Sequence, residues 1–190
     1  MIDNWNKLPI KTFIEINAIT QNRLDGFDAD YHLVKALTGL SEDELNAMPI
    51  PEFKLMLKKA SFLSMTNFGK AVDRFTIDGT EYKINWRVEQ KTAGQYIDLT
   101  HYCKRPFENM HYIMAVLTFF DKYDAKEVEK RAELFYNKLT MDIVYPICLF
   151  FLKVLSDSMT AIQDSLIKDT NKKIKALEKI IASESIGVGL

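Results

Sequence analysis

No glycine interrupts the chain between Thr140 and Ala182, and Pro146 is the only proline in that stretch. Apolar residues recur there at the three- and four-residue spacings that place them on one face of a helix. A continuous helix of this length would measure about 60 Å at ~1.5 Å per residue, whereas a globule of this chain length is about 40 Å across. We therefore predict a long C-terminal helix that either bends or restarts at Pro146, or projects and meets partners outside its own domain.

The two halves of this predicted helix differ in polarity. Apolar side chains are dense from Ile143 to Leu155, which is typical of a central core helix. From Asp157 onward they thin to a narrow seam among charged residues, a pattern found where one helix meets one or two others. The tail that follows carries alternating apolar residues that could add an edge strand to a partner or fill a groove on it. The predicted contacts in this region are Ile162, Leu166, Ile174, Leu177, Ile181, Ile186, Val188 and Leu190.

Composition narrows the class of protein. Of 190 residues, 47% are hydrophobic, and 25 Lys and Arg against 26 Asp and Glu give a net charge of −1. No basic excess attracts nucleic acid or an anionic membrane, so we expect any nucleic-acid role to be indirect. Two cysteines do not make a disulfide scaffold. The most apolar run, from Ile143 to Leu155, is too short for the ~20 residues that a bilayer requires, and we expect no membrane partner.

The spacing of apolar residues predicts a series of short helices and, at one place, changes to the two-residue alternation of β-strands. Capping boxes are expected at Ser41 with Glu44 and at Thr92 with Gln95. Further helix boundaries are expected at Pro9, Asp28, Gly39, Pro51, Pro106, Asp124 and Glu127. The fold class is mostly α, a multi-helix bundle with one β-hairpin insertion at about residues 74–88 and a long C-terminal helix. We expect a helical domain over residues 1–156 and a helix extension with its tail over 157–190, either in the same domain or as a projecting arm.

The hairpin is predicted because apolar and polar residues alternate on both sides of a two-residue turn. Asp78-Gly79 is a strong signal for such a turn. Because an isolated two-stranded hairpin is only marginally stable in water, we expect this one to pack on the helices or to pair with another chain. Its packing face would consist of Phe75, Tyr82, Ile84 and Trp86.

Few residues suggest a metal site, a catalytic site or a phosphate-binding site. His101, Cys103 and His111 resemble metal ligands, but a structural zinc site takes four, and Cys148 lies far along the chain in an apolar run. The chain has no Gly-x-Ser-x-Gly elbow and no glycine-rich phosphate loop. We therefore predict neither an enzyme nor a cofactor.

Two basic patches leave alternatives open. One patch lies on a short helix, and the other lies at the end of the long helix. Each patch is either an ordinary solvated helix face or a contact surface for an acidic partner or a nucleic-acid backbone. Their members are Lys54, Lys58 and Lys59 in the first, and Lys168, Lys172, Lys173, Lys175 and Lys179 in the second.

Three stretches together resemble small structural or assembly proteins of tailed bacteriophages of Bacteroidetes hosts, including crAss-like phages. They are residues 40–45 with 48–50, residues 75–82, and residues 94–99 with 111–117. The resemblance covers about residues 30–155. It implies ring or connector subunits, other internal virion proteins or tail assembly chaperones, and carries no catalytic residue.

Three functions follow as hypotheses. The first is a non-enzymatic virion structural protein, a ring or head-tail connector subunit that forms a homo-oligomer and binds other phage structural proteins, found in the virion and in host cytoplasm during assembly. The second is a tail assembly chaperone that binds a tail protein through adaptable methionines. The third is a cellular regulator with a metal site at His101, Cys103 and His111. The methionines of the chaperone hypothesis are Met110, Met114, Met141 and Met159.

Overall fold

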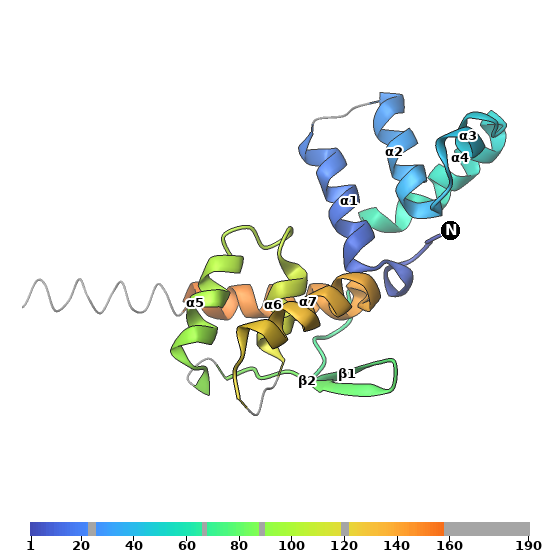
Figure 1. Cartoon of the computed structure of the whole chain (residues 1–190). Helices are drawn as coiled ribbons and strands as arrows, with labels where there is room; N and C mark the ends of the chain where they lie inside the picture. Colours follow the sequence, from blue (N-terminus) through green and yellow to red (C-terminus); the bar gives the residue numbers. More distant parts are fainter. Residues whose placement is uncertain (23–25, 66–67, 88–89, 119–121, 158–190) are drawn as a thin grey trace, which may run out of the picture. The chain divides into compact units, whose positions relative to one another are not determined.

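The computed structural model describes residues 1–22, 26–65, 68–87, 90–118 and 122–157. It is mostly helical with a single two-stranded antiparallel hairpin among these residues, as predicted (Figure 1). The chain forms two compact units, Met1–Phe150 and Phe151–Leu190. The helix that follows Thr140 is described over residues 141–157, and its predicted continuation lies outside the described residues.

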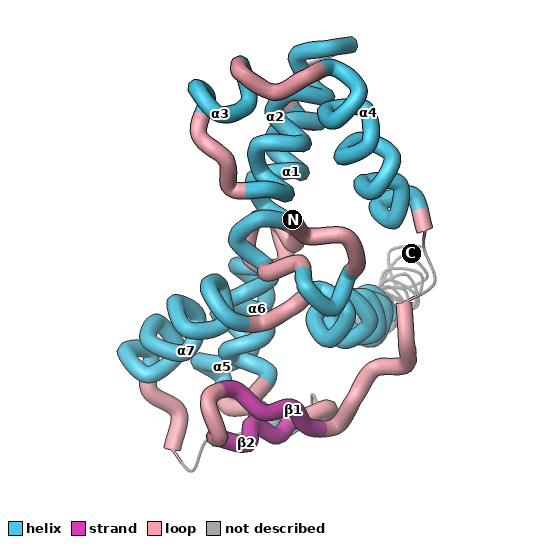
Figure 2. The backbone as a smooth tube through the Cα atoms, turned by 90° about the vertical axis from the view of Figure 1, so that its right-hand side faces the viewer, coloured by secondary structure: helices cyan, strands magenta, loops and turns pink. Residues whose placement is uncertain are grey.

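The N-terminal half of the first unit is a group of short helices. In chain order these are η1 (Trp5–Lys7), α1 (Ile10–Gln21), α2 (Gly26–Thr38), α3 (Glu42–Asn46), α4 (Ile50–Lys59) and η2 (Ala60–Ser64). Helices α1 and α2 lie side by side (Figure 2), and α4 packs against α2 and η2. A small core of Val34, Leu45 and Phe53 holds α2, α3 and α4 together.

Side-chain caps set some of the helix boundaries, whereas η1, α1, α4 and η2 have none. Both predicted capping boxes are present: the Glu44 backbone N–H donates to Ser41 Oγ, and the Gln95 backbone N–H donates to Thr92 Oγ1. Gly39 follows α2 with φ +70°, a conformation that glycine adopts without strain. The predicted cap at Asp28 is wrong. Helix α2 already begins at Gly26, so the Asp28 carboxylate lies in the first turn, where it still faces the positive end of the helix dipole.

The other half of the first unit surrounds α6. Its elements are β1 (Arg74–Ile77), β2 (Thr80–Lys83), α5 (Ala93–Tyr102), α6 (Met110–Leu117), α7 (Ala125–Lys138) and the start of the helix over 141–157. Helix α6 packs against α5 and α7, and it buries every residue except His111 and Tyr112. The main core of the molecule therefore lies along α6 and its neighbours.

A backbone clasp joins the start of the chain to the start of the last described helix. The Ile10 N–H donates to the Leu139 carbonyl at 3.0 Å, and the Met141 N–H donates to the Leu8 carbonyl at 2.9 Å. Pro9 and Thr140 form the bridge between them. The helix then runs without interruption through Pro146, so the predicted restart at that residue does not occur.

Candidate assembly surface

The hairpin turn is built by two residues with positive φ. Asp78 has φ +48° and Gly79 has φ +81°, the combination that a two-residue turn needs to match the twist of the flanking strands. The register pairs Phe75 with Tyr82 and Ile77 with Thr80. Phe75 and Tyr82 therefore stand opposite each other on one face of the hairpin.

That face packs on α7 of the same chain. The rings of Phe75 and Tyr82 stack with centroids 5.5 Å apart, and Phe135 meets both edge-on, at 5.4 and 5.0 Å. Phe135 is fully buried, and Phe75 is 5% exposed. Of the two predicted roles for this face, packing on the helices is the one that the structure shows, and it leaves little of Phe75 for a partner.

Ile84 and Trp86 continue beyond the strand. Ile84 is buried and forms an isolated bridge with Thr118, and the Asn85 N–H donates to the Leu117 carbonyl at 2.7 Å. The indole N–H of Trp86 donates to Asp73 Oδ1 at 2.8 Å. Its ring meets Phe150 edge-on at 5.1 Å. The chain after the hairpin is thus fixed to the end of α6, and Trp86 is held beside the last helix of the first unit.

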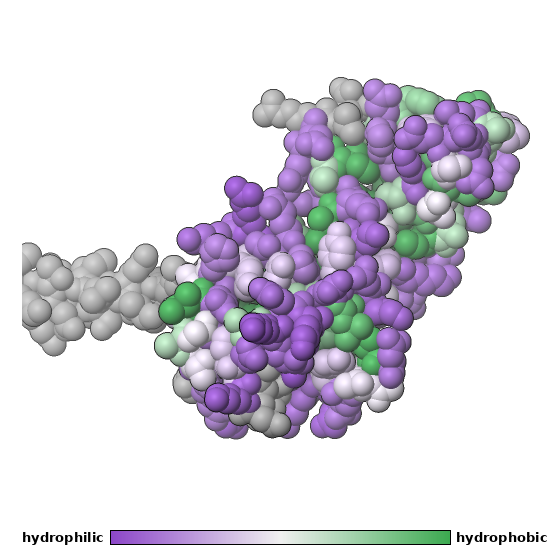
Figure 3. All heavy atoms as spheres, in the orientation of Figure 1, coloured by the Kyte–Doolittle hydropathy of each residue, from purple (hydrophilic) through white to green (hydrophobic). Residues whose placement is uncertain are grey.

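An exposed apolar surface forms where Trp86 meets that helix. Leu149 is 46% exposed and Phe150 is 50% exposed, while Val144 and Ile147 of the same helix are fully buried. We name Trp86, Leu149 and Phe150 the Trp86–Phe150 patch. Trp86 itself is partly buried, and large apolar side chains that stay partly exposed beside one another are typical of contact surfaces. Figure 3 shows on one face of the molecule how apolar residues lie in separate patches among hydrophilic ones.

The prediction of a core helix from Ile143 to Leu155 is wrong for Leu149 and Phe150, which stay about half exposed. The signal that could have found them is an uninterrupted apolar run of six residues, Ile147-Cys148-Leu149-Phe150-Phe151-Leu152. Six consecutive residues surround a helix, whereas one packed face needs only those at three- and four-residue spacings. Part of such a run must therefore face away from the core.

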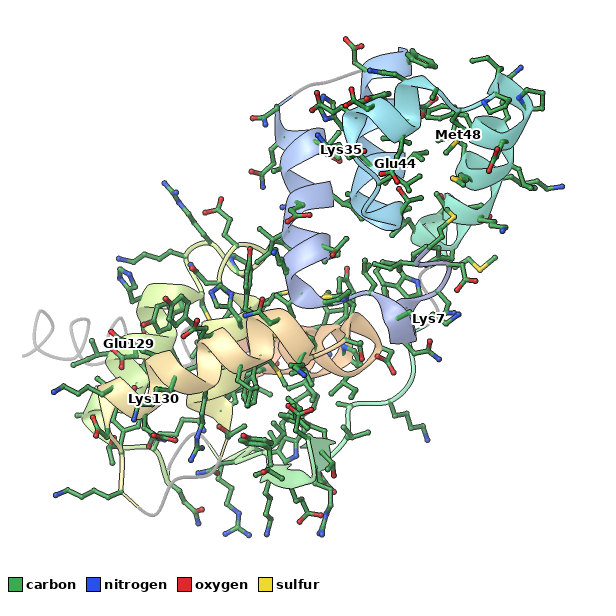
Figure 4. All side chains as sticks on the ribbon, turned by 45° about the vertical axis from the view of Figure 1, so that its right-hand side comes forward. Lys7, Lys35, Glu44, Met48, Glu129 and Lys130 are labelled. Carbon is green, nitrogen blue, oxygen red and sulfur yellow. The ribbon has the colours of Figure 1, made fainter. Side chains whose placement is uncertain are left out.

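A second surface feature is a pocket of about 380 Å³ lined by residues of α6 and α7. Its lining consists of His111, Tyr112, Glu129, Glu133 and Tyr136, and we name it the acidic–aromatic pocket. The His111 ring lies 4.4 Å from the Tyr112 ring and 5.1 Å from the Tyr136 ring. Figure 4 shows Glu129 on the ribbon of α7.

Burial sets the electrostatics of the pocket. It lowers the pKa of His111 to about 4, so this imidazole is neutral at neutral pH. Burial, with Glu15 nearby, raises the pKa of Tyr136. The acidic side chains that line the pocket are Glu129 and Glu133.

The metal ligands considered from the sequence do not form a site in the structure. His101 is exposed on α5, Cys103 caps the end of that helix, and His111 lines the acidic–aromatic pocket. Within the described ranges no three His, Cys, Asp or Glu side chains are placed to hold a metal ion. Burial raises the pKa of Cys103 to about 11 and also raises that of Cys148, so both thiols are protonated at neutral pH.

Of the predicted contacts of the long helix and tail and the methionines of the chaperone hypothesis, the structure describes only some. The seam and tail contacts, Ile162, Leu166, Ile174, Leu177, Ile181, Ile186, Val188 and Leu190, lie outside the described residues, as does Met159. The methionine groove of the chaperone hypothesis is wrong for the other three members. Met110 is 2% exposed, and Met114 and Met141 are fully buried, because their helix faces form the core.

Comparison with known proteins gives no relative. No protein-family model matches the chain, and neither a curated protein nor a solved structure matches it. No helix in the described part of the chain has both the length and the hydrophobicity needed to cross a membrane.

Proposed function

We propose that this chain is a non-enzymatic structural subunit of a tailed-bacteriophage particle, a ring or head-tail connector subunit that assembles with copies of itself. The observation that carries the proposal is the Trp86–Phe150 patch. Two aromatic rings and Leu149 form an apolar surface on a helix whose sequence continues as a thin apolar seam. Interface energy is concentrated in a few such large apolar side chains.

The patch has the features of a contact surface rather than of a loosely packed core. Trp86 is held by its hydrogen bond to Asp73 and by its edge-on contact with Phe150. A side chain that is already ordered loses less conformational entropy when a partner covers it. Leu149 and Phe150 present about half of their surface to solvent beside it. The patch is therefore prepared for burial against another surface.

The test is the oligomeric state of the full chain. Sedimentation velocity should show concentration-dependent assemblies for the wild type, and Leu149→Ser with Phe150→Ser should weaken self-association at least about tenfold, because two anchors lose their apolar area. Ile97→Ser is the matched control, since Ile97 is another large apolar side chain, is 64% exposed on α5 and is not a member of the patch. It should leave the assemblies unchanged.

Mass spectrometry of purified particles completes the test. A structural subunit should be present in mature particles in multiple copies. A wild-type chain that remains monomeric at high concentration and is absent from particles would contradict the proposal. Self-association combined with absence from mature particles would favour the tail assembly chaperone.

A further inference from the structure

Among the described residues, the carboxylates of the acidic–aromatic pocket have no ion-pair partner. No lysine or arginine lines the pocket, and Glu129 and Glu133 form no ion pair with any described residue. Glu127, on the same helix, differs because it pairs with Arg131. Beside the two carboxylates stand the rings of Tyr112 and Tyr136, whose faces attract cations. The pocket therefore presents negative charge and aromatic surface together.

Helix α4 presents the opposite chemistry. Lys54, Lys58 and Lys59 are exposed, and none of them forms an ion pair within the described ranges. Leu55 lies between them along the helix and is 53% exposed. The opposite side of α4 is occupied, since Phe53 is buried in the small core of α2, α3 and α4. The exposed side is thus a basic face with an apolar centre.

The spacings on the two helices match. Lys54 and Lys58 are four residues apart on α4, as Glu129 and Glu133 are on α7, so each pair is about 6 Å apart along its helix. Within one copy α4 packs against α2 and η2, while α7 packs against α6 and α1. The helices lie in different parts of the first unit, as Figure 4 also shows. Among the described residues, the two charged faces therefore form no ion pair with each other within one copy.

We infer that the basic face of α4 on one copy docks against the acidic–aromatic pocket of the next copy. This inference rests on the proposed function, because it requires that the chain assembles with itself. Lys54 and Lys58 pair with Glu129 and Glu133, and their aliphatic stems lie along the rings of the pocket. The contact joins two different surfaces, so it is heterologous and generates a ring when the rotation closes.

Reciprocal charge exchange in the full chain tests the contact. One variant carries Glu129→Lys with Glu133→Lys, and a second carries Lys54→Glu with Lys58→Glu. Each should weaken self-association about tenfold or more in sedimentation velocity at low salt, because attraction is replaced by repulsion at the same positions. Since every changed residue is exposed, thermal unfolding of the variants should resemble that of the wild type.

Recombining the two faces identifies the partner surface. An equimolar mixture of the two variants should regain association, because every contact between unlike variants joins a basic face to an acidic one. A chain with all four exchanges should regain them alone. Lys126→Glu with Lys130→Glu is the matched control. It makes the same charge change as Lys54→Glu with Lys58→Glu, on exposed positions of α7 outside the pocket lining, and it should have little effect.

The outcomes separate this inference from the proposed function. Wild-type assemblies that both variants form equally well would overturn the α4 contact and leave the structural role intact. Weakening in both variants without recovery on mixing would also overturn it, because the two faces would then not be each other's partners. A monomeric wild type would contradict the proposed function and this contact together.

Discussion

Phe135 connects the hairpin to the helical core. It is fully buried and meets Phe75 and Tyr82 edge-on, so one side chain on α7 supports both strands. Edge-to-face packing places the positive ring edge against the negative ring face, which adds to the hydrophobic gain. The hairpin is thus stabilised mainly by its contact with α7, because two strands alone are marginal in water.

Removal of this ring should be costly. Phe135→Ala should lower the free energy of unfolding by about 3–5 kcal/mol, through lost apolar burial and a cavity. Phe27→Ala should cost only about 1 kcal/mol, since Phe27 is 61% exposed. Urea unfolding followed by circular dichroism measures both. Equal losses for the two variants would show that Phe135 does not anchor the hairpin.

His111 should make stability depend on pH. Burial holds its pKa in the folded chain at about 4, below the ordinary value of 6.5, so the unfolded chain binds a proton first as the pH falls. Stability is therefore fully present above pH 6.5 and declines between pH 6.5 and 4. Between pH 7 and 5 the loss from this residue should be about 1–2 kcal/mol after allowance for solvent screening.

The contribution of His111 is isolated by His111→Phe, which keeps a ring beside Tyr112 and Tyr136 and cannot be protonated. Urea unfolding at pH 7 and pH 5 should show a smaller pH dependence for this variant than for the wild type. His101→Gln is the matched control, because His101 is exposed, and it should retain the wild-type dependence. If His111→Phe kept the wild-type pH dependence of stability, that dependence would come from other titratable groups.

At the scale of elements, short-range signals determine where helices and the hairpin begin and end. Ser41 and Thr92 donate and accept in complete capping boxes, which satisfy backbone N–H groups that the first helical turn leaves free. The hairpin turn also depends on a local feature, the backbone conformation of its two central residues. No atom lies within 4 Å of a Cβ built on Gly79, so only its φ of +81° restricts the residue that stands there.

Gly79→Ala tests this restriction. The substitution should destabilise the chain by about 1–2 kcal/mol, the usual cost of holding an L-residue in the left-handed region. Gly69→Ala is the control, because Gly69 has open space and no positive φ, so the change should be neutral or slightly stabilising. Thermal unfolding measures both. A neutral Gly79→Ala would show that the turn relaxes to another type.

At the scale of the whole molecule, contacts distant in sequence organise the first unit. The clasp of Leu8 and Ile10 with Leu139 and Met141 joins the two ends of this unit through backbone hydrogen bonds. Leu8, Ile10 and Met141 are fully buried around it. The clasp and the α6 core bury the apolar residues around them, whereas Leu149, Phe150 and the lysines of α4 stay exposed.

The sequence by itself determined the class of fold, both capping boxes, the hairpin and the pair Phe75 and Tyr82 of its packing face. Each depends on signals within a few residues: a Ser or Thr followed by Glu or Gln, an Asp-Gly turn, and alternation along a strand. For Asp28 the local signal is ambiguous, because an aspartate near a helix start can be the N-cap or can lie in the first turn. The start of α2 at Gly26 places Asp28 in the first turn.

Only the tertiary structure decided which apolar and charged residues remain exposed. Periodicity marks a helix face as apolar, but exposure depends on whether another element covers that face. Hence Met110, Met114 and Met141 are core residues, while Leu149 and Phe150 meet solvent. The acidic–aromatic pocket likewise needs α6 beside α7, and this juxtaposition arises from packing between segments that share no local sequence signal.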